Sequence, residues 1–101
     1  MSDGAQLLHL VLVRWRRPVD DVAVAGLASA ARALSASIPG IRALCEGPSV
    51  SPEGLEDGYD WCLAISFDDA HARDGYLPHP EHVVVAQELG RLAESMIVFD
   101  V

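Results

Sequence analysis

Residues 76–82 hold the side chains best suited to acid-base chemistry. They read Tyr-Leu-Pro-His-Pro-Glu-His, and so bring one phenol and two imidazoles close together in the chain. Prolines on either side of His79 restrict the backbone, which suits a site whose side chains must stay in place. Pro80 is typical of the first residue of a helix, because its missing N–H would have no partner there. His82 then falls in the first turn, where the helix dipole disfavours imidazolium, so we expect a neutral His82 and, before it, a Tyr76 that reaches back to it.

The same segment contains a possible pair of metal ligands. His79 and His82 stand three positions apart, a spacing at which a helix can present two ligands to one ion. A third ligand is missing nearby, because Glu81 points elsewhere on the helix and His71 belongs to a separate segment. We therefore expect no metal and no organic cofactor, and we expect His79 to cap the helix or hold the turn and to contact a bound substrate.

Composition limits the classes of protein that this chain can be. A chain of 101 residues, half of them apolar, is one domain spanning residues 1–101. No apolar run approaches the roughly 18 residues of a membrane span. The net charge of -8 argues against nucleic acid and anionic membranes as partners, since both demand clustered basic residues. Arginines follow rather than precede the apolar run 7–13, so it is no signal peptide and we expect a cytoplasmic protein.

Two further features of the composition carry expectations. Every basic residue is Arg, while Lys, Thr and Asn are absent, which suggests a GC-rich bacterial genome. Cys45 and Cys62 lack the spacing of metal ligands. We expect them to be small buried residues without a disulfide.

The elements that must position residues 76–82 follow from the hydrophobic period. Strands are predicted for residues 7–15, 41–46, 59–67 and 96–101. Helices are predicted from a cap at Asp20 or Asp21 to Ile38, from a cap at Asp68 or Asp69 to Gly75, and from Pro80 through Leu92. Residues 47–58 are rich in Gly, Pro and Ser and read as a loop. This order predicts an α+β domain with a ferredoxin-like, four-stranded antiparallel sheet and helices on one face.

Alternation divides the strands into two faces. The large side chains that share one face are His9, Val11, Val13, Trp15, Trp61, Leu63, Ile65 and Phe67. The small side chains of the third strand, such as Ala64, lie on the other face and would let helices approach closely. We therefore expect the helices on the small-residue face, and a second copy of the chain against the large-residue face, because that face cannot stay wet.

Several short motifs, in order along almost the whole chain, resemble one family. They are His9-Leu10-Val11-Leu12, Ile38-Pro39-Gly40-Ile41, Gly47, Gly58-Tyr59, Phe67, the Tyr-x-x-His-Pro-x-His block and Val98-Phe99-Asp100. This pattern is similar to that of the stress-responsive dimeric α+β barrel (Dabb) family. The resemblance implies a homodimer in which two ferredoxin-like subunits form an eight-stranded barrel, with a cavity in each subunit.

Within that family the chain is similar to a plant polyketide cyclase that closes a linear poly-β-keto chain by aldol condensation. By motif, the catalytic tyrosine and histidine of that enzyme match Tyr76 and His82, and its pocket histidine matches His9. Trp61 stands where that enzyme has another pocket histidine, so we expect a different substrate. The residues expected to contact a hydrophobic substrate are His9, Val11, Val13, Trp15, Trp61, Leu63 and His79.

Three functions remain open from the sequence. The first is a cofactor-independent cyclase or lyase of bacterial secondary metabolism, in which His82 is the base and Tyr76 the orienting donor. The second is a non-catalytic stress-responsive barrel that binds apolar small molecules. The third is a cofactorless monooxygenase of the same fold, against which the absence of Asn counts. An open cavity faced by both Tyr76 and His82 would favour the first, and a filled interior would favour the second.

Overall fold

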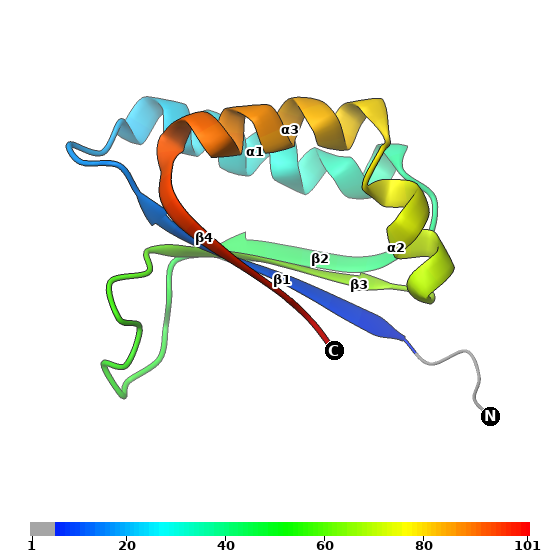
Figure 1. Ribbon diagram of the computed structural model, residues 1–101, viewed down its shortest axis with the longest axis horizontal. Helices are drawn as coiled ribbons and strands as arrows, with labels where there is room; N and C mark the ends of the chain where they lie inside the picture. Colours follow the sequence, from blue (N-terminus) through cyan, green and yellow to red (C-terminus); the bar gives the residue numbers. More distant parts are fainter. Residues whose placement is uncertain (1–5) are drawn as a thin grey trace.

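The computed structural model describes residues 6–101, which form a sheet covered on one side by helices (Figure 1). The elements follow in the order β1 (Leu7–Trp15), α1 (Asp21–Ser37), β2 (Ile41–Gly47), β3 (Trp61–Phe67), α2 (Ala70–Tyr76), α3 (Pro80–Leu92) and β4 (Ala93–Asp100). The ferredoxin-like α+β class predicted from the sequence is therefore confirmed. The fourth strand starts at Ala93 rather than at residue 96, because α3 runs directly into β4.

The four strands pair antiparallel in the order β2-β3-β1-β4, so β1 lies inside the sheet. The register brings distant parts of the chain together at one end of β1. His9 lies opposite Ile65 of β3 on one side and opposite Asp100 of β4 on the other. This register places the last residue of β4 beside the first histidine of the chain.

The helices begin where the sequence predicts capping residues. The Asp20 carboxylate accepts a hydrogen bond from the backbone N–H of Ala23 at 3.0 Å, and Asp69 accepts one from Ala72 at 2.8 Å. Helix α3 has His79 as its N-cap residue and Pro80 in its first turn. These caps satisfy N–H groups that have no partner within the helix.

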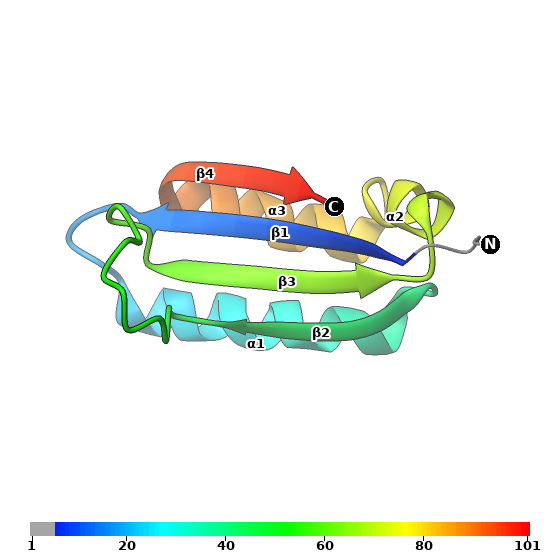
Figure 2. The ribbon, with the colours of Figure 1, turned by 90° about the horizontal axis from the view of Figure 1, so that it is seen from below.

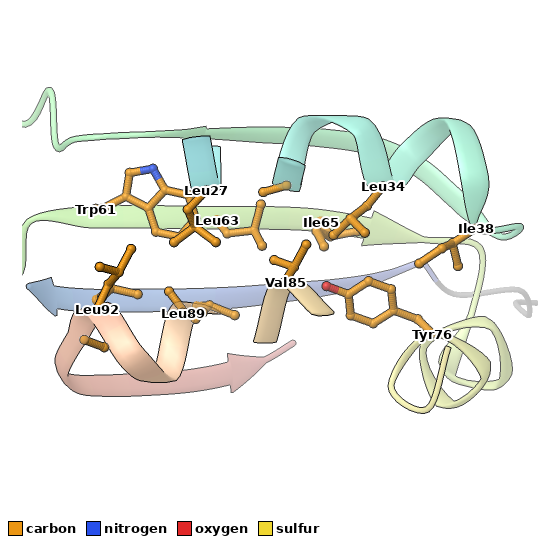
Figure 3. Packing of buried hydrophobic residues seen from close by; sticks show 14 of the residues in the cluster. Leu27, Leu34, Ile38, Trp61, Leu63, Ile65, Tyr76, Val85, Leu89 and Leu92 are labelled. Atoms are coloured by element: carbon orange, nitrogen blue, oxygen red, sulfur yellow. The ribbon is translucent and has the colours of Figure 1, made fainter. Parts of the chain in front are cut away.

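The predicted assignment of the two sheet faces is wrong, because the helices cover the large-residue face. Val13, Ile65 and Phe67 are fully buried there. They pack with apolar side chains from the helices, namely Leu27, Ala31, Leu34, Val85, Leu89 and Leu92 (Figure 3). Large side chains on both layers exclude water between sheet and helices, and the small residues of β3 are left on the outside.

The opposite side of the sheet, which we call the open face, carries an apolar surface that no described element covers in residues 6–101 (Figure 2). Its apolar residues on β1 and β4 are Leu8, Leu10, Leu12, Ile97 and Phe99. Leu10 pairs with Phe99, and Leu12 with Ile97, across the two strands. Phe99 is 62 % exposed and Ile97 41 %. An apolar surface of this kind marks an interface more often than a surface that stays in water.

The two cysteines lie on neighbouring strands, and both are free thiols. Cys62 is half-buried, whereas Cys45 is exposed, so the expectation that both are buried is wrong for Cys45. Burial raises the pKa of the Cys62 thiol, with a smaller contribution from Cys45. No helix in the described part of the chain is both long and apolar enough to span a bilayer.

Candidate acid-base site

Tyr76 ends helix α2 with its side chain turned into the core. It is 1 % exposed, and Figure 3 shows its hydroxyl directed toward Val85 in the layer between sheet and helices. Burial raises the pKa of Tyr76 to about 12, because the phenolate would lose its solvation there. Tyr76 is therefore a neutral phenol at physiological pH, able to donate a hydrogen bond but not to act as a base.

His82 lies in the first turn of α3, and its ring meets that of Tyr76. The ring centroids are 4.2 Å apart, with an interplanar angle of 40°. Nδ1 of His82 lies 2.8 Å from the carbonyl oxygen of Leu77. Because a carbonyl oxygen only accepts, Nδ1 must carry the hydrogen, and Nε2 of the neutral ring keeps a free lone pair.

The protonation state of His82 also favours a role as a base. Burial lowers its pKa from the ordinary 6.5, the contact with Leu77 opposes that shift, and the nearby His9 and His79 add to the lowering. The ring is consequently neutral near pH 7, as the sequence predicts. The expected juxtaposition of Tyr76 and His82 is present, as contact between their rings.

His9 lies on the other side of Tyr76, which places the phenol between two imidazoles. The centroids of His9 and Tyr76 are 5.9 Å apart with an edge-on angle of 68°, and Phe67 packs against both rings. His9 is 5 % exposed, although its imidazole is polar. A polar side chain in such a position requires a partner.

Asp100 and Arg73 provide that partner. Nδ1 of His9 lies 2.6 Å from Oδ1 of Asp100, and the Arg73 guanidinium forms an ion pair with the other carboxylate oxygen. Partial burial opposes ionisation of Asp100, but the hydrogen bonds from His9 and Arg73 outweigh it and hold the pKa of Asp100 below its ordinary value. The carboxylate is therefore ionised and can only accept, so Nδ1 of His9 carries a hydrogen.

The remaining predicted substrate residues of the sheet lie in the core at varying distance from this group. Val11, Val13 and Leu63 are buried between sheet and helices. Trp15 and Trp61 pack on each other with centroids 5.5 Å apart. Figure 3 shows Trp61 and Tyr76 at opposite ends of the cluster. A substrate that touches both would have to extend along the layer between the sheet and the helices, and contact with these residues stays a prediction.

His79 caps helix α3, as expected. Its Nδ1 accepts a hydrogen bond from the backbone N–H of Glu81 at 3.1 Å. It also borders a cavity of about 260 Å³ between the turn after α1 and helix α2, together with Ile38, Pro39, Gly40, His71, Ala72 and Gly75. Within residues 6–101, no group of three or more His, Cys, Asp or Glu side chains is arranged to hold a metal ion.

Arg73 is a member of this site that the sequence analysis does not predict. Arg73 precedes Tyr76 by three positions, which puts both on one face of α2. That spacing is the signal that could have found it. The link between His9 and Asp100 depends on the pairing of β1 with β4.

The fold and the ring contact define the class of protein. It is a ferredoxin-like α+β subunit in which a neutral phenol and a neutral imidazole are in contact where α2 meets α3. The chain belongs to the Dabb family, since the model of the stress responsive A/B barrel domain matches residues 7–101. The resemblance inferred from the sequence motifs is thereby confirmed. No curated protein matches the chain.

Solved structures share the fold over nearly the whole chain. A dimeric ferredoxin-like protein of unknown function from Bacteroides fragilis is 28 % identical, with a TM-score of 0.81, covering 98 % of this chain and 96 % of its own. A hydroxynitrile lyase from Passiflora edulis is 16 % identical, with a TM-score of 0.88 and coverage of 98 % and 94 %. A Dabb family protein from Mesorhizobium loti is 20 % identical, with a TM-score of 0.77 and coverage of 95 % and 94 %. The last two support the fold alone.

Proposed function

We propose that this protein is a cofactor-independent cyclase that closes a ring by aldol-type condensation of an uncharged, polyketide-like molecule in bacterial secondary metabolism. The observation that carries the proposal is the contact between Tyr76 and His82, with ring centroids 4.2 Å apart. The Leu77 carbonyl holds the hydrogen of His82 on Nδ1, so Nε2 is free to take a proton. The two rings thus bring a phenol and an imidazole into contact.

The chemistry assigns one role to each side chain. Nε2 of His82 removes a proton from an activated methylene flanked by carbonyl groups, and the resulting carbanion attacks a second carbonyl of the same chain. As that carbon–carbon bond forms, the carbonyl π electrons move to oxygen, and the Tyr76 hydroxyl donates a hydrogen bond to the developing alkoxide. The proton on His82 then returns to that oxygen, so the step needs no other reactant. Positioned acid-base groups of this kind contribute about 10²- to 10⁴-fold in rate.

The charges around the site support an uncharged substrate. The Arg73 guanidinium is the cation of this group, and it is already held by Asp74 and Asp100. A substrate carboxylate would find this cation neutralised, while Asp100 would repel it. An enolisable carbonyl chain, in contrast, needs only the phenol and the imidazole.

One observation favours a second candidate, a non-catalytic barrel that binds apolar molecules. Tyr76 is 1 % exposed, and its ring is covered by Phe67 at 5.0 Å between centroids, as well as by both imidazoles. The enzyme therefore requires the helices α2 and α3 to separate slightly when substrate enters. A protein that only binds apolar molecules needs no access of substrate to Tyr76 and His82, so its helices can stay in place.

The proposal is tested with linear triketide and tetraketide thioesters, with cyclised products measured by mass spectrometry above the spontaneous background. His82→Ala should abolish turnover and leave the oligomeric state unchanged, whereas the exposed His71→Ala serves as a matched control and should retain turnover. Turnover of the unmodified protein should rise with pH as His82 loses its proton. The midpoint should lie below 6.5, because burial lowers the pKa of His82. Full activity of His82→Ala would remove His82 from the mechanism, and binding of these thioesters without turnover would favour the second candidate.

We also infer that the protein is a homodimer whose subunits meet through their open faces and complete an eight-stranded barrel. The apolar residues of that face, among them Phe99 and Ile97, support this arrangement because they would otherwise stay in water. The related protein from Bacteroides fragilis is described as dimeric. Helices and candidate site then lie outside the barrel, one site to each subunit.

A further inference from the structure

Arg73, Asp100 and His9 form a chain of polar groups that the proposed reaction does not yet use. Each comes from a different element, α2, β4 and β1. Their side chains are 23 %, 24 % and 6 % exposed, so the chain runs from the edge of the molecule into its core. Its inner end is the imidazole that packs edge-on against Tyr76.

The geometry fixes the Asp100 carboxylate at both oxygens. Oδ1 accepts from Nδ1 of His9 at 2.6 Å, and Oδ2 is paired with Nη1 of Arg73. Arg73 is itself held at a second point, because its Nε donates to Asp74 at 2.8 Å. A carboxylate bound only to His9 could rotate about its own axis, whereas one bound on both sides cannot.

This restraint decides how His9 is presented. Because Nδ1 carries the hydrogen bonded to Asp100, Nε2 is the ring nitrogen on the side turned away from the carboxylate. The Tyr76 and Phe67 rings, 5.9 and 6.1 Å from the His9 centroid, limit rotation of the imidazole. The charged group in contact with His9 is Asp100, which is itself paired with Arg73. The other titratable groups near His9 are the neutral phenol of Tyr76 and the ring of His82.

We propose that Arg73 is a positioning residue of the site. By holding Asp100, it keeps His9 in the Nδ1–H tautomer, so that His9 offers an unprotonated Nε2 to a hydroxyl or enol of the substrate. This inference rests on the proposed function and narrows its substrate class to molecules that combine an enolisable carbonyl with an O–H donor. Arg73 itself touches neither the substrate nor the reacting atoms.

The test compares three variants of the full chain, labelled with nitrogen-15. Arg73→Met removes the cation, and Arg73→Lys keeps a positive charge without the several N–H donors of the guanidinium. Arg32→Met is the control. It removes a similar ion pair between α1 and β2, where Arg32 contacts Glu46 at 2.6 Å. Long-range proton–nitrogen spectra report the tautomer of each imidazole, and His9→Gln assigns the His9 signals. Turnover of a linear tetraketide thioester is measured on the same samples.

The unmodified protein should show His9 as the Nδ1–H tautomer, with its N–H signal shifted downfield by the bond to Asp100. Arg73→Met should lose that signature and lower kcat by about 10- to 100-fold, the range found when the partners that orient metal-ligating histidines are removed. KM should change less than kcat. Arg73→Lys should recover part of the His9 signal and part of kcat, and Arg32→Met should match the unmodified protein in both readouts.

The proposal is overturned if Arg73→Met keeps the His9 tautomer, or if it changes the tautomer without lowering kcat below that of Arg32→Met. Should Arg73→Met fail to fold, Arg73→Gln removes the charge at nearly unchanged length and is judged by the same two readouts. A protein that turns over no polyketide thioester refutes the proposed function. The imidazole spectra still decide whether Arg73 controls His9.

Discussion

Replacement of Tyr76 by phenylalanine separates the catalytic role of the hydroxyl from its structural role. The ring packs between the imidazoles of His9 and His82, and phenylalanine keeps that packing. Tyr76→Ala would instead leave a cavity that costs about 3–5 kcal/mol. Only the conservative variant therefore tests the hydroxyl.

The expected changes follow from the burial of that hydroxyl. Taking a hydroxyl out of water costs about 1–3 kcal/mol on protein scales, and a hydrogen bond returns about 0.5–1.5 kcal/mol. The free energy of unfolding should thus change by no more than about 2 kcal/mol in either direction. The rate should fall much further, by about 10²- to 10⁴-fold, which equals about 2.7–5.4 kcal/mol in the activation free energy.

Two assays on one preparation measure these quantities. Urea unfolding followed by circular dichroism gives the stability, and mass spectrometry of the cyclised product from a tetraketide thioester gives kcat. Because the pKa of Tyr76 is about 12, the rate of the unmodified protein should show no loss near neutral pH from ionisation of this phenol. Turnover by Tyr76→Phe within threefold of the unmodified protein, with unchanged stability, would refute the donor role of the hydroxyl.

Two further predictions concern the assembly and the fold. Phe99→Arg should convert the dimer into a monomer in light scattering, because it places a charge on the open face. Val22→Arg should leave the dimer intact, because Val22 on α1 is 85 % exposed. An unmodified protein that is monomeric would contradict this interface. Gly40→Ala should lower the free energy of unfolding by about 2–4 kcal/mol, since Gly40 has a φ of 89° and a Cβ there would lie 2.5 Å from Cβ of Ala72. Gly54 has a φ of 71°, and a Cβ there would meet no atom within 4 Å. Gly54→Ala should therefore lose only the free energy of unfolding that comes from the strained backbone. An equal loss in both variants would show that the contact with Ala72 is unimportant.

Local chemistry explains why so much of this protein follows from its sequence. The periods of apolar residues determine each helix and strand, and capping residues such as Asp20, Asp69 and His79 mark where helices begin. The pairing of Tyr76 with His82 is also local. His82 follows Tyr76 by six positions, and the turn at the start of α3 returns one ring to the other.

Only the tertiary structure decides which face of the sheet is covered. Alternation shows that β1 has two apolar faces, with Val13 on one and Leu12 on the other, but it does not show which one the helices occupy. That choice depends on the complementary volumes of side chains from α1 and α3, which no single strand reveals. The same limit applies to the link of His9 to Asp100 and Arg73. These groups meet because β4 pairs with β1 and α2 reaches the end of that pair, and contacts across 91 and 27 positions of the chain leave no local pattern.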